Sequence, residues 1–215
     1  ERITARVEAV VSAVAVPVTV KTRTGLDIDD EYGVDAAVAA EQAGATMVVI
    51  HGRSRACRFV GPVRFKPVAN ATQRLKIPLL VNGDITDKQT ATVAVTQTAA
   101  DGVMIGRGAI GQPWLFQVLT GGEMPSVRER LCVMGEHLQH MHQFYGLQQG
   151  VRIARKHIQA YLQTLGVAQL IPQFMSLDTA FEQLTWLNAL TECRIKSLQQ
   201  QALATPQMAA NSAYR

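Results

Sequence analysis

Four short apolar runs, each ending in a polar or glycine-containing signature, stand out in the hydrophobic pattern of the chain. They are VTVKTRTG (18–25), VVIHGR (48–53), LLVNGD (79–84) and GVMIGRG (102–108). Apolar runs of this length, bounded by turn residues, are typical of buried strands. Parallel α/β proteins collect catalytic and phosphate-binding groups at the carboxyl ends of their strands. We therefore interpret the four signatures as neighbouring parts of one active-site edge.

Helical segments separate these runs. The predicted helices cover about 2–14, 33–43, 66–75, 88–98 and 111–119. The first carries an apolar stripe made of Ile3, Val7, Val10, Val11 and Val14. Gly44 is expected to end the second helix, and Thr86 or Asp87 to cap the fourth. Strands that alternate with helices in this way indicate βαβ units and a parallel sheet.

The pattern changes after residue 119, where TGGEMP (120–125) is typical of a linker. Beyond it the apolar spacing is helical. We expect helices at about 126–145, 150–165 and 174–200, the last two separated by Pro172. The end of the chain is rich in Ala, Gln and Asn and is expected to fray. The predicted domains are 1–119, 120–205 and a tail, 206–215.

Four strands with their helices cannot close a barrel. Eight are needed, and an open half would expose an apolar edge and an apolar inner face. The chain also begins without a Met. The predicted fold class is therefore α/β: the C-terminal half of a TIM (β/α)₈ barrel, with strands 5 to 8, followed by an all-α helical domain.

Composition narrows the class of protein. No apolar stretch reaches the roughly 18 residues of a membrane span. The three cysteines form no CxxC pair, which favours a reducing cytoplasm over a disulfide framework and gives no metal-binding spacing. We expect a cytoplasmic protein with no membrane partner and no metal.

The net charge is +4, and residues 42–83 contain no Asp or Glu. This stretch favours a phosphate-bearing partner, although a solvated surface with its acids elsewhere in the fold remains an alternative.

Two glycine-containing signatures predict a phosphate site. Gly106 and Arg107 follow the fourth run, where backbone amides can approach a phosphate and the guanidinium can clamp it. Asn82, Gly83 and Asp84 follow the third run. Barrels often build a phosphate site after strands 7 and 8, so we number these two strands accordingly. The alternative is a pair of tight turns with Arg107 in a surface ion pair.

Basic residues follow the first two runs. Lys21 and Arg23 alternate along one strand and so share a face at its carboxyl end. Two cations in a barrel mouth favour an anionic or electron-rich ligand such as a flavin or nucleotide, unless the lysine has a structural partner. His51 ends the second run and could hold a phosphate or ring carbonyl, act as an acid, or be structural.

The helical part carries a basic cluster of its own. Arg152, Arg155 and Lys156 stand at i, i+3 and i+4, hence on one helix face, and FYG (144–146) precedes them. Basic groups beside aromatic rings suit contacts with RNA backbone and bases. A solvated helix face is the alternative.

These segments resemble the tRNA-dihydrouridine synthases, and within them the bacterial B-type branch. The resemblance runs through VPVTVKTRTG, VIHGRSRACRFVG, IPLLVNGDITD and DGVMIGRGAIGQPWLF, and resumes at HQFYG and GVRIARKHIQAYL. It covers about residues 5–165, in order and at the family's spacing. The last 50 or so residues are less similar.

The resemblance implies a fold, an activity and residue roles. The fold would be an FMN-binding (β/α)₈ barrel with a helical tRNA-binding domain, and the enzyme would reduce uridine to 5,6-dihydrouridine in tRNA with NADPH. The implied cofactor-binding residues are Lys21, His51, Asn82, Gly83, Asp84, Gly106 and Arg107. The implied tRNA-facing residues are Arg23, Arg53, Arg55, Arg58, Arg152, Arg155 and Lys156.

The resemblance leaves out one catalytic group. The family protonates C5 of the base with a Cys on a loop after strand 4, which would lie upstream of residue 1. Cys57 follows the second run and does not match that position. We expect the chain alone to bind FMN poorly and to be inactive. Two alternatives remain: a non-catalytic RNA-binding remnant of such an enzyme, or another FMN or sugar-phosphate barrel enzyme.

Overall fold

A computed structural model describes residues 2–58 and 60–204 of the chain. The chain divides into two compact units, one α/β and one helical. The α/β unit comprises Glu1–Ala109 and Leu115–Gly122, and the helical unit comprises Ile110–Trp114 and the chain from Glu123 onward. The short segment 110–114 therefore belongs with the helices, although sequence spacing places it among the strand–helix repeats.

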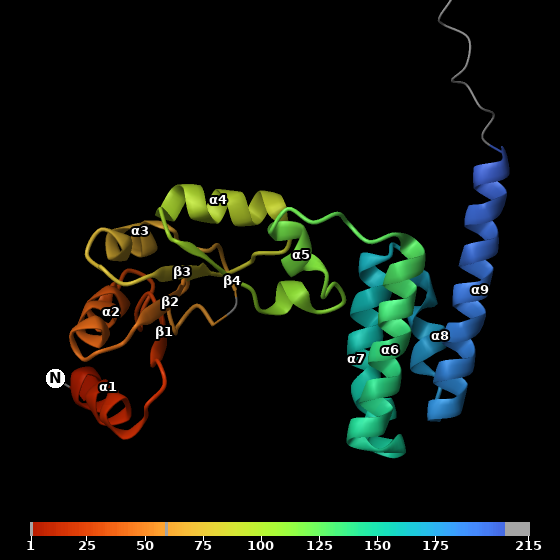
Figure 1. Ribbon diagram of the computed structural model, residues 1–215, viewed down its shortest axis with the longest axis horizontal. Helices are drawn as coiled ribbons and strands as arrows, with labels where there is room; N and C mark the ends of the chain where they lie inside the picture. The colour runs from red at the N-terminus through yellow and green to blue at the C-terminus, as the bar shows by residue number, and fades with distance from the viewer. Residues whose placement is uncertain (1, 59, 205–215) are drawn as a thin grey trace, which may run out of the picture. The chain divides into compact units, whose positions relative to one another are not determined.

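The α/β unit is built on a four-stranded sheet (Figure 1). Its strands are β1 (Thr19–Arg23), β2 (Met47–His51), β3 (Leu79–Asn82) and β4 (Gly102–Met104). All neighbours are parallel, and the strand order β1-β2-β3-β4 follows the chain. The predicted α/β class with a parallel sheet is confirmed.

Five α-helices accompany the sheet: α1 (Arg2–Ala13), α2 (Tyr32–Gln42), α3 (Lys66–Thr72), α4 (Lys88–Thr98) and α5 (Leu115–Leu119). Of the two predicted caps of α4, Asp87 is the one observed, since its side chain accepts a hydrogen bond from the Thr90 amide at 2.8 Å. Gly44 follows α2 with φ +97°, a left-handed conformation that suits glycine. The last helix begins four residues later than predicted, and a 3₁₀ turn, η1 (Arg107–Ala109), precedes it.

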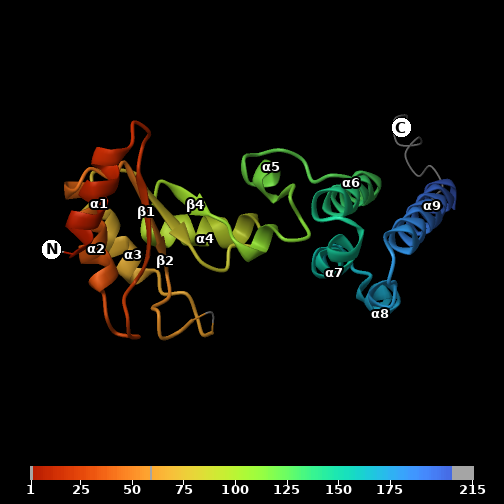
Figure 2. The same cartoon turned by 90° about the horizontal axis from the view of Figure 1, so that it is seen from below.

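The core of this unit lies between one face of the sheet and its helices. Val48, Ile50, Leu79 and Val81 are at most 1% exposed and pack against small residues of α2, α3 and α4. Figure 2 shows the strands in front of α3 and α4. Helix α1 packs on α2 through Val7 and Val11. The rest of its predicted stripe is exposed: Ile3, Val10 and Val14 are 41%, 50% and 44% accessible.

The opposite face of the sheet carries the polar residues. Successive side chains of a strand point to opposite faces of the sheet, and residues paired in register on neighbouring strands point to the same face. Strand register places Arg23 beside His51, His51 beside Asn82, and Asn82 beside Met104. This row runs across all four strands at their carboxyl ends. Pairing in register therefore brings together residues that lie as much as 81 positions apart in the sequence.

The helical unit contains α6 (Val127–Tyr145), α7 (Leu147–Thr164), α8 (Ile171–Met175) and α9 (Ala180–Ala204), with a 3₁₀ turn, η2 (Ala168–Leu170), before α8. Ser126 and Glu129 form a capping box at the start of α6. Pro172 lies between α7 and α9, as predicted, but it belongs to a short helix, α8, that the sequence did not predict. Pro172 lies in the first turn of α8, where its missing amide hydrogen costs no helical bond.

Helix α9 begins at Ala180 instead of 174, because Thr179 and Glu182 cap it. The Glu182 carboxylate accepts from the Thr179 amide at 2.9 Å, and the Thr179 hydroxyl accepts from the Glu182 amide at 3.1 Å. The unit packs around buried Met134, Leu138 and Ile158. No helix among the described residues is long and apolar enough to cross a membrane. The tail expected to fray (206–215) lies outside the described residues.

Candidate functional site

A cavity of about 440 Å³ lies at the carboxyl edge of the sheet. All seven residues predicted to bind a cofactor line it: Lys21, His51, Asn82, Gly83, Asp84, Gly106 and Arg107. They come from the ends of all four strands and from η1. Arg23, Ile85, Thr86 and Gly108 complete the lining. The structure thus brings the predicted residues to one place, and their role toward a cofactor stays a prediction.

His51 is held neutral in this cavity. Its pKa is lowered to about 4, first by burial and then by the positive charges of Lys21, Arg23 and Arg53, against a smaller opposing effect of Asp84. Its Nδ1 accepts a hydrogen bond from the Arg53 amide at 3.2 Å, which places the ring hydrogen on Nε2. At neutral pH His51 is therefore an uncharged hydrogen-bond donor in a positively charged site.

The cavity is also electropositive at β1. The pKa of Lys21 is lowered, first by burial and then by the charge of Arg23. An anion placed beside Lys21 and Arg23 would favour the charged form of Lys21 and so raise its pKa again. The site therefore favours a ligand that carries negative charge.

Arg53 does not face outward as predicted. Its side chain is 4% exposed, and its Nη1 donates to Asp84 Oδ1 at 2.9 Å while its Nε donates to the Gly61 carbonyl at 2.8 Å. The side-chain hydrogen bond and charge of Arg53 lower the pKa of Asp84, and Arg107 lies 3.2 Å from the same carboxylate. As placed, Arg53 braces the loop after β2 against the loop after β3, and Asp84 orients two guanidinium groups.

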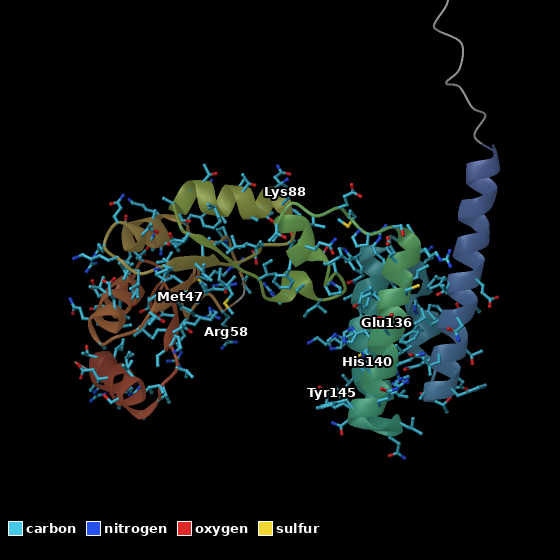
Figure 3. The ribbon with its side chains drawn as sticks, in the orientation of Figure 1. Met47, Arg58, Lys88, Glu136, His140 and Tyr145 are labelled. Carbon is cyan, nitrogen blue, oxygen red and sulfur yellow. The ribbon has the colours of Figure 1, made fainter. Side chains whose placement is uncertain are left out.

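Arg23 has a similar bracing role. Its Nη1 donates to the backbone carbonyls of Ser54 and Arg58 at 2.8 and 2.6 Å. It thereby holds the loop that carries Arg55 and Arg58, both of which are exposed as the tRNA prediction requires. Figure 3 labels Arg58 on this loop, which follows β2. Arg23 and Arg53 are anchors of the loop, whereas Arg55 and Arg58 are available at the surface.

Glycines shape the wall of the cavity. A Cβ atom added at Gly106 would meet no atom within 4 Å, so the backbone there is open to a ligand. At Gly108 the same atom would lie 2.1 Å from the Ile85 carbonyl oxygen, so only glycine fits. Sequence reasoning missed Gly108, although it is the second glycine of the GRG signature. Asn82 donates to the Met104 carbonyl at 2.7 Å, which joins β3 to β4.

The basic helix face is only partly as predicted. Arg152 and Lys156 are exposed on α7. Arg155 instead donates to the Leu177 carbonyl at 3.0 Å and to Asp178 Oδ1 at 2.7 Å, and its side chain is 29% exposed. Arg155 therefore joins α7 to the segment between α8 and α9. The predicted three-residue face reduces to Arg152 and Lys156.

Exposed aromatic and apolar side chains gather at the turn between α6 and α7. Phe144, Tyr145 and Leu147 are 82%, 44% and 69% exposed. The rings of Phe144 and Tyr145 pack edge to face with centroids 4.9 Å apart. Such a turn offers aromatic surface to bases. The FYG triplet was the available sequence signal, but the high exposure of Phe144 could not be read from it.

The model of the dihydrouridine synthase family matches residues 1–200. The chain belongs to the dihydrouridine synthase family. The "tRNA-dihydrouridine synthase B" of Pasteurella multocida is 44% identical over 161 residues, which are 72% of this chain and 48% of that protein. The protein of the same name from Pseudomonas aeruginosa is 42% identical over 179 residues, 80% of this chain and 54% of that protein.

The Proteus vulgaris protein of that name is 40% identical over 192 residues, 86% of this chain and 59% of that protein. This member of the dihydrouridine synthase family therefore spans about half the length of the curated relatives it matches. The predicted B-type branch is confirmed by these relatives. Among the described residues, no group of three or more His, Cys, Asp and Glu side chains could hold a metal ion.

Proposed function

We propose that this chain is the FMN-phosphate- and tRNA-binding part of an enzyme that reduces uridine to 5,6-dihydrouridine in tRNA. NADPH would be the reductant. The observation that carries the proposal is the convergence of all seven predicted cofactor residues on one electropositive cavity, in a chain of the dihydrouridine synthase family. NADPH would supply the hydride through FMN to C6 of the uracil, a Cys would supply the proton to C5, and NADP⁺ would be released.

The residues of the cavity fit FMN. Arg107 and the open backbone at Gly106 suit a phosphate, which needs donors and close backbone approach. Lys21 and Arg23 offer positive charge at the end of β1 that suits an electron-rich ring. Neutral His51 can donate from Nε2 to a ring carbonyl without adding charge. In this proposal Asp84 positions Arg53 and Arg107 and does not itself bind the phosphate, since it is a carboxylate already paired with both.

Four exposed cations are proposed to contact tRNA: Arg55 and Arg58 from the loop after β2, and Arg152 and Lys156 from α7. Each could neutralise a phosphate, so binding should weaken as salt is added. The exposed rings of Phe144 and Tyr145 add a surface on which bases can stack. Arg23 and Arg53 would act indirectly, by holding the loop that presents Arg55 and Arg58.

We infer that the sheet corresponds to strands 5 to 8 of a (β/α)₈ barrel. Its strands are parallel and follow chain order, as adjacent barrel strands do. Its core residues face the helices, and the opposite face holds Lys21, His51 and Asn82, which would line the barrel interior. The catalytic Cys would then lie in the other half, after strand 4. Cys57 is a free thiol whose sulfur accepts a hydrogen bond from the Ser54 hydroxyl at 3.2 Å, and we do not assign it this role.

The proposal is tested by comparing this chain with a longer protein that joins it to a complete upstream barrel half of the B-type branch. FMN binding is followed by flavin fluorescence, and NADPH oxidation is measured with and without unmodified tRNA. We expect weak FMN binding and no dihydrouridine from the chain alone, and tRNA-dependent NADPH oxidation by the longer protein. In the longer protein, Lys21→Ala should weaken FMN binding. Lys88 is an exposed lysine on α4, and Lys88→Ala should leave FMN binding unchanged.

Three other outcomes would change or replace the proposal. Dihydrouridine formed by the chain alone would overturn the placement of the catalytic Cys. Salt-sensitive tRNA binding by the longer protein without NADPH oxidation would identify a non-catalytic RNA-binding member of the family. NADPH oxidation with no binding of tRNA would instead identify an FMN or sugar-phosphate enzyme that acts on small molecules.

A further inference from the structure

A group of basic side chains gathers between α6 and α7 in the helical unit. The rings of His137 on α6 and His157 on α7 pack edge to face with centroids 5.1 Å apart. Both side chains are half-buried. Exposed Lys156 precedes His157, and exposed His140 lies one turn beyond His137. We call these four residues the histidine cluster.

Tyr161 is within hydrogen-bond distance of His137. Tyr161 is 1% exposed, and its hydroxyl lies 3.2 Å from His137 Nδ1. Burial raises the pKa of Tyr161 to about 12, so the hydroxyl keeps its proton and can donate it to Nδ1. The neutral imidazole then carries its hydrogen on Nε2, away from Tyr161. In this tautomer the Nε2–H of His137 is a donor that Tyr161 does not use.

The neighbouring charges that shift the pKa values of the two rings are all positive. Burial lowers the pKa of His137, and the neighbouring His157 and His140 lower it further. Burial also lowers the pKa of His157, followed by the charge of Lys156. No carboxylate in the described part of the chain raises the pKa of either histidine. Protonation of these histidines is disfavoured by the neighbouring positive charges, and a bound anion would offset that repulsion.

Other charged groups of α6 and α9 form no ion pair with the cluster among the described side chains. Glu136 is an exposed acid one helical turn before His140, and Figure 3 shows Glu136, His140 and Tyr145 in succession along α6. Arg130 lies over the ring of Trp114, 6.0 Å from its centroid. Glu182, on the packed helix α9, is bonded to the backbone amides of residues 178 and 179. Lys156 and the histidines are thus left without a carboxylate partner among the described side chains.

We propose that the histidine cluster is a binding site for backbone phosphate of tRNA, and that binding there takes up protons. This inference rests on the proposed function, because it names a contact for the same tRNA. A phosphate beside the rings would favour their protonated forms, so the complex would hold more protons than the free protein. By linkage, affinity then rises as pH falls. A complex that takes up one proton gains up to about tenfold in affinity per pH unit.

The test measures the Kd of the 215-residue chain for an unmodified tRNA transcript between pH 5.5 and pH 8 at constant ionic strength. We expect binding about three- to tenfold tighter at pH 6 than at pH 8. His157→Gln should flatten this dependence. Lys156→Gln should weaken binding about threefold at every pH and reduce the salt slope by about one. Lys88→Gln is the matched control: it removes the same charge from exposed α4 and should change neither quantity.

The outcomes separate this inference from the function it rests on. If the unaltered chain does not bind tRNA, the proposed tRNA contact and this inference both fail. If it binds tRNA but His157→Gln keeps the full pH dependence, or Lys156→Gln behaves as Lys88→Gln does, only the histidine cluster is excluded. Lys156 is exposed, so its variant remains informative if a change at half-buried His157 disturbs folding.

Discussion

At the scale of single residues, two glycines that lack a Cβ atom shape the cavity. Gly106 and Gly108 flank Arg107, yet a Cβ atom meets nothing at the first and the Ile85 carbonyl oxygen at the second. Gly108→Ala must therefore displace backbone and should lower the free energy of unfolding by about 2 kcal/mol. Gly106→Ala should leave stability within about 0.5 kcal/mol and weaken FMN binding instead. Denaturant unfolding of both variants of this chain, and flavin titration of both in the longer protein, check this, and equal stabilities would contradict it.

The titration of His51 is a second test at this scale. Its pKa in the folded protein is about 4, against about 6.5 for an unfolded histidine. The unfolded chain therefore binds more protons in this interval, and His51 makes the fold lose stability as pH falls from about 6.5 toward 4. His51→Gln should reduce that loss. Nitrogen chemical shifts of the imidazole across this range give the pKa directly, and a value near 6.5 would show that His51 is not desolvated.

At the scale of elements, the loop after β2 is held by a buried guanidinium. Asp84→Asn removes the charged partner of Arg53, which is only 4% exposed, and should cost about 2 kcal/mol of unfolding free energy at pH 7. The paired state lowers the pKa of Asp84, so this contribution is present above the carboxyl's unfolded pKa and is lost as acid protonates it. The unaltered protein and Asp84→Asn should therefore converge in acid.

The exposed ion pair between Asp35 and Arg74 is a control for the pair between Asp84 and buried Arg53. Asp35 pairs with Arg74 at 2.8 Å, and the two side chains are 65% and 48% exposed. Asp35→Asn should change the unfolding free energy by less than about 1 kcal/mol, because solvent screens exposed pairs. A loss equal to that of Asp84→Asn would contradict the bracing role of Arg53.

At the scale of the whole molecule, segment 110–114 belongs to the helical unit despite its position between η1 and α5. Thr164 donates to the Gly111 carbonyl at 2.8 Å, and Trp114, 7% exposed, packs on Tyr161 with ring centroids 6.0 Å apart. Trp114→Ala should destabilise the helical unit by about 3 kcal/mol. Phe116→Ala, two residues later and 53% exposed, is the control and should cost less than about 1 kcal/mol. Thermal unfolding followed by far-ultraviolet circular dichroism compares them.

The sequence by itself determined the strands, the parallel sheet, a cap at Thr86 or Asp87, and seven of the residues that line the cavity. These features depend on local periodicity and on the rule that parallel strands end at one edge. Only the tertiary structure decided which arginines are buried. Arg53, Arg58 and Arg155 look alike in a sequence, but Asp84 and Asp178 engage two of them from 31 and 23 residues away. The boundaries around Pro172, the membership of segment 110–114 and the meeting of His137 with His157 were decided in the same way. Each depends on contacts between residues distant in the chain, which local pattern does not contain.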